Sequence, residues 1–186
     1  MSTLDSQRKT LSQTRPADWD KLPDIPLYMD QVISYMPRQL MDLEGGETLT
    51  SAMVNNYIKA GLLPRADGKK YSREHIALLT VICILKHVLT AREIGLLLKN
   101  ALKDSSTELL YRSFCKSLDR EIVSVLSDMD SDIRENDTAA LSLRFSIAAY
   151  SRQLASLRIL DTLEVEDAPA KQPKQKKLKS NKSEGS

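Results

Sequence analysis

Five cationic side chains gather near the middle of this 186-residue chain, with few acids among them. They are Lys59, Arg65, Lys69, Lys70 and Arg73. Clustered lysine and arginine residues neutralise phosphates, so this stretch is suited to the backbone of a nucleic acid. A solvated basic loop that binds nothing is the alternative. We favour phosphate contact, because the charges are concentrated on one short segment.

Side chains that suit base recognition come just before these cations. Asn55 and Asn56 each offer a donor and an acceptor that match the edge of adenine in the major groove. They could equally be ordinary polar residues on an exposed helix face, and the sequence leaves both readings open. The residues predicted to contact DNA are Ser51, Asn55, Asn56, Lys59, Arg65, Lys69, Lys70, Tyr71 and Arg73.

Other reactive residue types lack the partners that catalysis or metal binding needs. His75 and His87 have no cysteine, second histidine or carboxylate pair at ligand spacing, so both are expected to be ordinary histidines. Cys83 and Cys115 are far apart in apolar helical surroundings, which predicts buried free thiols. The sequence has no glycine-rich phosphate loop, nucleophile elbow or paired-carboxylate motif. We therefore expect no enzymatic activity, no metal and no cofactor.

Local signals predict the helix that carries the asparagines. Thr50 is the expected N-cap of a helix over residues 51–60 with one apolar face. Gly61 is expected to end that helix in a left-handed conformation, so that Leu62 and Leu63 fold back onto the core.

The cations that follow lie on a segment too short for anything but a tight turn. Within this segment, Arg65 to Tyr71, the dipeptide Asp67-Gly68 favours a two-residue hairpin, and we call the segment the wing. Ser72 then caps a helix to about His87. This helix is apolar around most of its circumference, so it should lie at the centre of the core.

Upstream of the site, the chain changes from polar to periodic. Residues 1–20 carry no apolar stripe and are predicted to be a flexible arm, with ordered structure beginning near Trp19 or Leu22. Apolar residues then recur at helical spacing from Met29 to Met36, which predicts a helix. A loop or a short extra helix should fill residues 37–48.

The second half of the chain is predicted to be helical. Thr90 and Glu93 form a capping box at the start of one helix, and Ser105 and Glu108 form another at the start of a longer one. A polar break at residues 135–137 separates this longer helix from a second long segment.

The second long segment carries apolar residues at the spacing of a coiled-coil seam. They are Leu143, Ile147, Tyr150, Leu154 and Leu157. Such a seam either joins two chains in a homodimer or packs on the helix over residues 106–133 of its own chain. We favour the homodimer, because symmetry would double the few base contacts that one helix makes.

Composition limits the fold and the compartment. Helix-forming residues are abundant, glycines number 6 and aromatic residues make up 5%, so the fold class should be mainly α with a small sheet. The N-terminus has no apolar core of signal-peptide length, and no segment approaches the roughly twenty uncharged apolar residues that cross a bilayer. The expected location is cytoplasmic, without membrane attachment.

The central stretch YIKAGLLPRADGKKYSREHIALL resembles the MerR-type winged helix-turn-helix regulators. The positions that match their pattern are Tyr57, Gly61, Leu62, Leu63, Pro64, Tyr71 and Ser72. With the leading LPDIPLYMDQV and the N-N-Y before the stop, the chain looks still more like a bacterial family catalogued as domain of unknown function 1836 (DUF1836), itself MerR-like.

The resemblance implies a DNA-binding transcriptional regulator that contacts double-stranded DNA through helix 51–60 and wing 65–71. MerR regulators usually carry R-Y-Y where this chain has Asn55, Asn56 and Tyr57. This missing arginine, together with an excess of acids over residues 104–167, supports an alternative, which is a non-enzymatic protein-interaction module on the same scaffold.

Four regions are therefore expected. They are a flexible N-terminal arm over 1–20, a MerR-like winged-helix domain over 21–103, a helical hairpin or dimerisation region over 104–167, and a disordered basic tail over 168–186.

Overall fold

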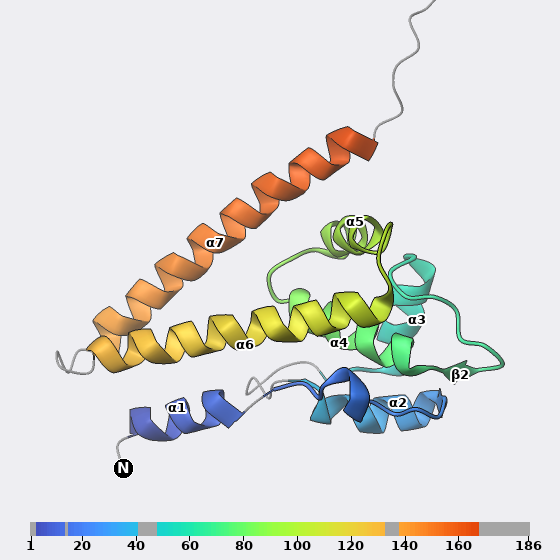
Figure 1. Ribbon diagram of the computed structural model, residues 1–186, viewed down its shortest axis with the longest axis horizontal. Helices are drawn as coiled ribbons and strands as arrows, with labels where there is room; N and C mark the ends of the chain where they lie inside the picture. Colours follow the sequence, from blue (N-terminus) through green and yellow to red (C-terminus); the bar gives the residue numbers. More distant parts are fainter. Residues whose placement is uncertain (1–2, 14, 41–47, 133–137, 168–186) are drawn as a thin grey trace, which may run out of the picture.

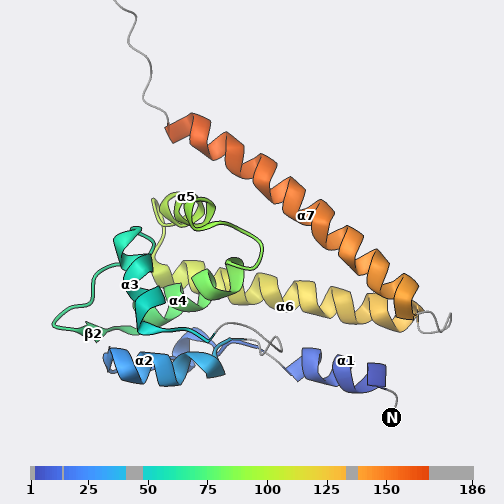
Figure 2. The ribbon, with the colours of Figure 1, turned by 180° about the vertical axis from the view of Figure 1, so that it is seen from behind.

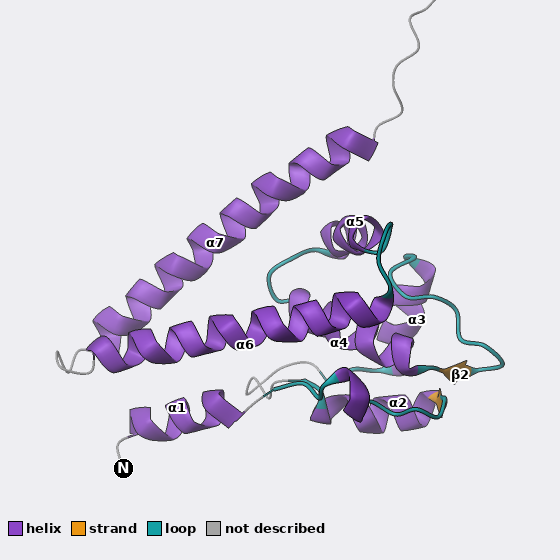
Figure 3. Ribbon diagram, in the orientation of Figure 1, coloured by secondary structure: helices purple, strands orange, loops and turns teal. Residues whose placement is uncertain are grey.

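A computed structural model describes residues 3–13, 15–40, 48–132 and 138–167 of the chain. Helices dominate this part of the molecule, which confirms the mainly α fold class (Figures 1 and 3). The elements are α1 (Thr3–Gln13), η1 (Trp19–Lys21), β1 (Leu27–Tyr28), α2 (Met29–Tyr35), η2 (Met36–Arg38), α3 (Ser51–Lys59), β2 (Lys70–Tyr71), α4 (Arg73–Leu85), α5 (Ala91–Ala101), α6 (Thr107–Asp132) and α7 (Thr138–Asp167). No helix in the described ranges is both long and apolar enough to cross a membrane.

Helix α4 lies at the centre of the core, as its sequence predicts. Its residues from Ile76 to Cys83 are buried, and Leu79 and Ile82 have no exposed surface. Helix α6 packs along α4 (Figure 1). Burial raises the pKa of the Cys83 thiol to about 11, so this thiol stays neutral and behaves as a small apolar side chain.

The small sheet forms between segments that are far apart in the sequence. Strand β1 pairs antiparallel with β2, and Leu27 lies opposite Tyr71. The prediction of a hairpin within residues 65–71 captured only the turn, because β2 takes its partner strand from the segment before α2. This pairing fastens the wing to the start of α2.

The turn of the wing lies one residue later than the Asp67-Gly68 dipeptide predicts. Asp67 and Lys70 exchange two backbone hydrogen bonds of 3.1 and 2.8 Å, so the central residues are Gly68 and Lys69. Both have positive φ, of 52° and 66°, as a type I′ turn requires. The register is set by Tyr71, which is buried, because a one-residue slip would turn its ring to solvent.

The N-terminal segment differs from the predicted arm. Residues Thr3–Gln13 form α1, which lies along the far end of α6 (Figure 1). Arg8 forms an ion pair with Asp130, and Arg15 Nε lies 2.6 Å from the carboxylate of Asp119. Because α1 has no apolar stripe, these charged partners on α6 could not be anticipated from its own sequence.

Core packing begins at Trp19, as the sequence predicts. The Trp19 ring packs on Tyr111 of α6 at 6.1 Å between centroids, and the Tyr111 hydroxyl donates a 2.8 Å hydrogen bond to the carbonyl of Ala17. Helix α2 also confirms the prediction, and η2 follows it with Pro37 in its first turn. Of the predicted 37–48 connection, residues 41–47 lie outside the described part of the chain.

The cap of α6 corrects one prediction. The backbone N–H of Leu109 donates to Ser106 Oγ at 3.2 Å, so Ser106 is the N-cap and the Ser105–Glu108 box does not form. Glu108 instead pairs with Arg112 one turn later, at 2.8 Å. By contrast, the Thr90–Glu93 box is present at the start of α5.

Helix α7 diverges from α6 and crosses toward α5 (Figures 1 and 2). The side chain of Gln153 donates a 2.7 Å hydrogen bond to the carbonyl of Val88, and Leu160 is buried against the core. The predicted seam is divided, because Leu157 packs against the core whereas its other four residues, Leu143, Ile147, Tyr150 and Leu154, are exposed. The polar break at 135–137 and the predicted tail at 168–186 lie outside the described residues.

Candidate nucleic-acid interface

Helix α3 is fixed at both ends by the residues that the sequence singles out. Thr50 Oγ accepts a 3.3 Å hydrogen bond from the backbone N–H of Met53, and Gly61 stops the helix with φ of 73°. Leu62 and Leu63 are buried, and Val54 anchors the helix in the core with no exposed surface. The orientation of α3 is thus set by its inner face, which leaves the opposite face to solvent.

The outward face of α3 carries the predicted contact residues. Ser51, Asn55, Asn56 and Lys59 are all exposed. Ala52 is exposed on the same arc, and sequence reasoning missed it because alanine carries no polar group. This face is neutral apart from Lys59, so it is suited to hydrogen bonds and methyl contacts more than to charge pairing.

The residues predicted around the wing divide into two groups. Arg65, Lys69 and Lys70 are exposed. Tyr71 is buried, with its ring edge-on to His75 at 5.5 Å between centroids, so it anchors the wing and does not present its ring on the surface. Arg73 is half-buried.

Arg73 faces the N-terminal segment more than the wing. Its guanidinium lies 5.8 Å from the centroid of the Trp19 ring, and its Nε donates to the carbonyl of Pro23 at 3.5 Å. The structure therefore brings together Asn55, Lys59, Arg65 and Lys69, and it sets Arg73 apart.

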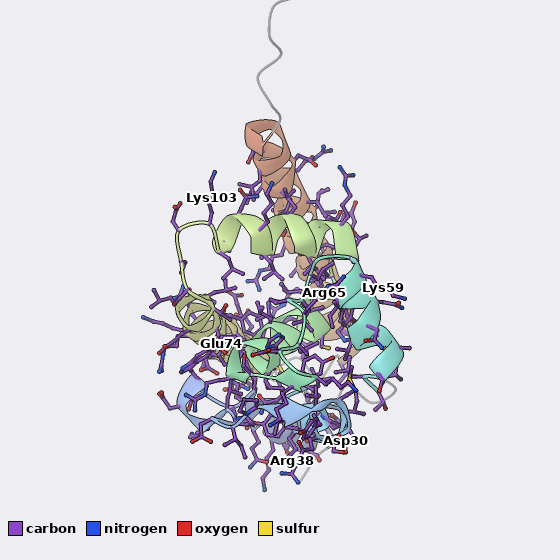
Figure 4. The ribbon with its side chains drawn as sticks, turned by 90° about the vertical axis from the view of Figure 1, so that its right-hand side faces the viewer. Asp30, Arg38, Lys59, Arg65, Glu74 and Lys103 are labelled. Carbon is purple, nitrogen blue, oxygen red and sulfur yellow. The ribbon has the colours of Figure 1, made fainter. Side chains whose placement is uncertain are left out.

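A groove of about 600 Å³ runs between α3 and the wing, and we call it the α3–wing groove. Lys59 of α3 and Arg65 of the wing both line it, and both are labelled in Figure 4. The residues that line it are Met29, Asn55, Ile58, Lys59, Arg65, Ala66, Lys69 and Tyr71. Three of its eight lining side chains are cationic and none is acidic. An anion therefore meets only favourable charge in this groove.

Several cations elsewhere in the described structure are paired with carboxylates, unlike those of the groove. Arg15, Arg112 and Arg152 each pair with a carboxylate at 2.6 to 2.8 Å. Among the described residues, no carboxylate forms an ion pair within 4.0 Å with Lys59, Arg65 or Lys69. These side chains keep their charge available to a ligand.

Two contacts hold the wing in place beside the groove. The Nζ of Lys70 lies 5.3 Å from the centroid of the Tyr28 ring on β1, a cation–π contact that sequence reasoning missed. His75 accepts from the backbone N–H of Ser72 through Nδ1, and its Nε2 lies 3.3 Å from the carbonyl of Arg65. His75 thus joins the start of α4 to the wing and has a structural role.

The start of α4 holds one ionised carboxylate near this site. The Ser72 hydroxyl donates a 2.5 Å hydrogen bond to Glu74, and this bond lowers the pKa of Glu74 below its usual value. Glu74 does not line the α3–wing groove, so its charge does not close the groove to an anion.

These features define a class of protein, namely a helical domain that presents a capped helix and a cationic turn on either side of one groove. The chain belongs to the family described as domain of unknown function (DUF1836), whose model matches residues 17–114. The matched region runs from the segment before Trp19 into α6 and includes α3 and the wing. No curated protein and no solved structure matches the chain.

Proposed function

We propose that this protein is a non-enzymatic DNA-binding transcriptional regulator that uses a MerR-like winged helix-turn-helix. Helix α3 enters the major groove of double-stranded DNA, and the wing lies on the adjacent phosphates. The observation that carries the proposal is the α3–wing groove, which has three cations and no acid among its lining residues. Asn55, which lines this groove, and the exposed Asn56 next to it in α3 supply base contacts.

The outward face of α3 favours A·T pairs over G·C pairs. Asn55 and Asn56 suit the donor and acceptor of adenine, and the methyl group of Ala52 suits the thymine methyl. Guanine is most often read by arginine or lysine, and the exposed arc of α3 carries no arginine and one lysine, Lys59, which also lines the groove. Selected sites should therefore be rich in A·T where α3 contacts them.

Selection of bound duplexes from a random pool, followed by fluorescence anisotropy, tests the proposed function. We expect enrichment of an A·T-containing motif and affinity that falls as salt rises, because phosphate contacts release counterions. Failure to enrich any motif, together with no binding at low salt, would contradict DNA binding and would favour the protein-interaction module.

The proposal includes a homodimer through α7. Four of the five apolar residues of the predicted seam are exposed on this helix, and the fifth, Leu157, is partly buried against the core. The exposed four are Leu143, Ile147, Tyr150 and Leu154. They follow one another at steps of four, three and four residues, as in a coiled-coil seam. The stripe spans about 16 Å at 1.5 Å per residue, and a second copy of α7 would cover it. A symmetric dimer would also place two copies of α3 on two half-sites.

Replacing Ile147 by aspartate is expected to convert the dimer to a monomer. A carboxylate in an apolar seam loses its hydration without a partner, so the monomer is favoured. Sedimentation velocity measures the result. The matched control is Ile159→Asp, since Ile159 is equally exposed on α7 but lies outside the stripe. A wild-type chain that sediments as a monomer at every concentration would rule out the homodimer.

The interaction module is the second candidate, and the same exposed stripe is the observation that favours it. In that case the stripe would bind a different protein and α3 would bind no DNA. Affinity capture with intact protein and with Ile147→Asp distinguishes the two functions. A stoichiometric partner that resists nuclease and is lost with Ile147→Asp would support the module.

A further inference from the structure

The α3–wing groove is more than a row of cations, because part of its lining is apolar and half-buried, and we call this part its floor. Met29 at the start of α2, Ile58 of α3 and Ala66 of the wing are half-buried and line the groove. The cations Lys59, Arg65 and Lys69 line the same groove and are exposed. One groove thus offers carbon surfaces and charge to the same ligand.

The backbone of a DNA strand presents charged and carbon surfaces in alternation, which match those of the groove. Its phosphates are anionic, and between them each deoxyribose presents C–H groups, including the two hydrogens of C2′. A strand that lies in the groove can place phosphates against the cations while its sugars pack on the carbon surface. No lining residue is acidic, so nothing in the groove repels the phosphates.

We propose that the α3–wing groove holds the sugar–phosphate backbone of one DNA strand, and that Met29, Ile58 and Ala66 discriminate deoxyribose from ribose. This inference rests on the proposed function and adds a specificity to it. The 2′-hydroxyl of a ribose in the groove faces the carbon atoms of the floor, where it loses hydration without gaining a hydrogen bond. The amino and guanidinium groups are occupied by phosphates.

Met29 is the residue on which this discrimination can be tested most cleanly. It is the first residue of α2, so a glutamine there keeps the helix and brings an amide within reach of the groove. An amide can accept from and donate to a 2′-hydroxyl, which removes the reason for the penalty.

The experiment places single ribonucleotides at each position of the selected DNA duplex in turn and measures anisotropy with the full chain. At one or two neighbouring positions on one strand we expect the affinity of the wild-type chain to fall about fivefold, the lower end for an unpaired hydroxyl in a partly open site. A 2′-fluoro nucleotide at the same positions shares the sugar pucker of ribose and lacks the hydroxyl, so it should cost little.

We expect the Met29→Gln variant to lose most of the ribonucleotide penalty, which is the ratio of its own affinities for the all-DNA duplex and the substituted duplex. The control is Ile25→Gln, because Ile25 is exposed and does not line the groove; its penalty should equal that of the wild type. Ala66→Ser places a hydroxyl on the same floor and should reduce the penalty even if Met29→Gln folds poorly.

The outcomes separate this inference from the proposed function. If a duplex is recovered and a ribonucleotide leaves its affinity unchanged at every position, the inference is overturned while DNA binding stands. A penalty that 2′-fluoro reproduces, or that both floor variants leave unchanged, also overturns it. If no duplex is recovered, the proposed function fails and the inference fails with it.

Discussion

Replacing Leu79 by alanine is expected to lower the free energy of unfolding by about 2 to 5 kcal/mol. Leu79 has no exposed surface and lies at the middle of α4, which is buried on most of its circumference. The substitution removes buried carbon atoms and leaves a cavity that the surrounding helices fill only in part. Urea denaturation followed by circular dichroism measures the change.

The matched control is the same substitution at an exposed position. Leu109 of α6 is 62% exposed, so Leu109→Ala should change the free energy of unfolding by no more than about 0.5 kcal/mol. Similar destabilisation by the two variants would contradict the placement of α4 at the centre of the core. Because α4 also supports the wing through His75 and Tyr71, the Leu79 variant should lose DNA affinity as it unfolds.

The elements that the sequence predicted correctly are those with local determinants. Thr50 caps α3 through a contact three residues away, and Gly61 ends it with its own φ. Thr90 and Glu93 likewise meet within one helical turn. Such signals need no knowledge of the rest of the chain, so they can be read directly.

The elements that could not be predicted depend on distant partners. Strand β1 exists because Leu27 and Tyr71 pair across the long segment between them, and neither strand is long enough to show a pattern. Helix α1 is held on α6 by the ion pair between Arg8 and Asp130, and these two residues lie far apart in the sequence. No window of the sequence contains both members of either pair.

The candidate site shows the same division. The exposure of Asn55 and Lys59 follows from the period of an amphipathic helix. Met29 could not be assigned to the site, because the groove forms only when α2 and the wing are joined by the sheet. Tyr71 is buried, whereas its neighbour Lys70 is exposed. Side chains of a strand alternate in this way, but a strand of two residues is too short for the alternation to be recognised in the sequence.

The double substitution Lys69→Ala and Lys70→Ala is expected to weaken DNA binding by roughly tenfold or more at low salt, and to reduce the slope of log affinity against log salt by about two. Each phosphate contact releases close to one counterion, so two lost contacts change the slope by about 0.9 each. The fold should survive. Lys69 already has a positive φ with a side chain, so alanine adds no new backbone strain.

The same loss of charge elsewhere is the control for this prediction. Lys9 on α1 and Arg120 on α6 are exposed and lie away from the groove, so Lys9→Ala with Arg120→Ala should leave the slope unchanged. Anisotropy titrations with the selected duplex from about 50 to 200 mM salt give both quantities. A slope that is equal for the two double variants would mean that the wing makes no phosphate contact.

The two wing lysines, Lys69 and Lys70, should not contribute equally to DNA affinity, and the difference tests where the structure places each side chain. Lys69 lines the groove, whereas the ammonium of Lys70 lies over the Tyr28 ring and must leave that contact to reach a phosphate. A cation–π contact at an exposed site contributes about 0.5 to 1 kcal/mol. Lys69→Ala should therefore weaken binding more than Lys70→Ala does. Tyr28→Leu removes the ring and should increase the contribution of Lys70 to DNA affinity. Lys70→Ala should therefore weaken DNA binding more in the Tyr28→Leu variant than in the wild type.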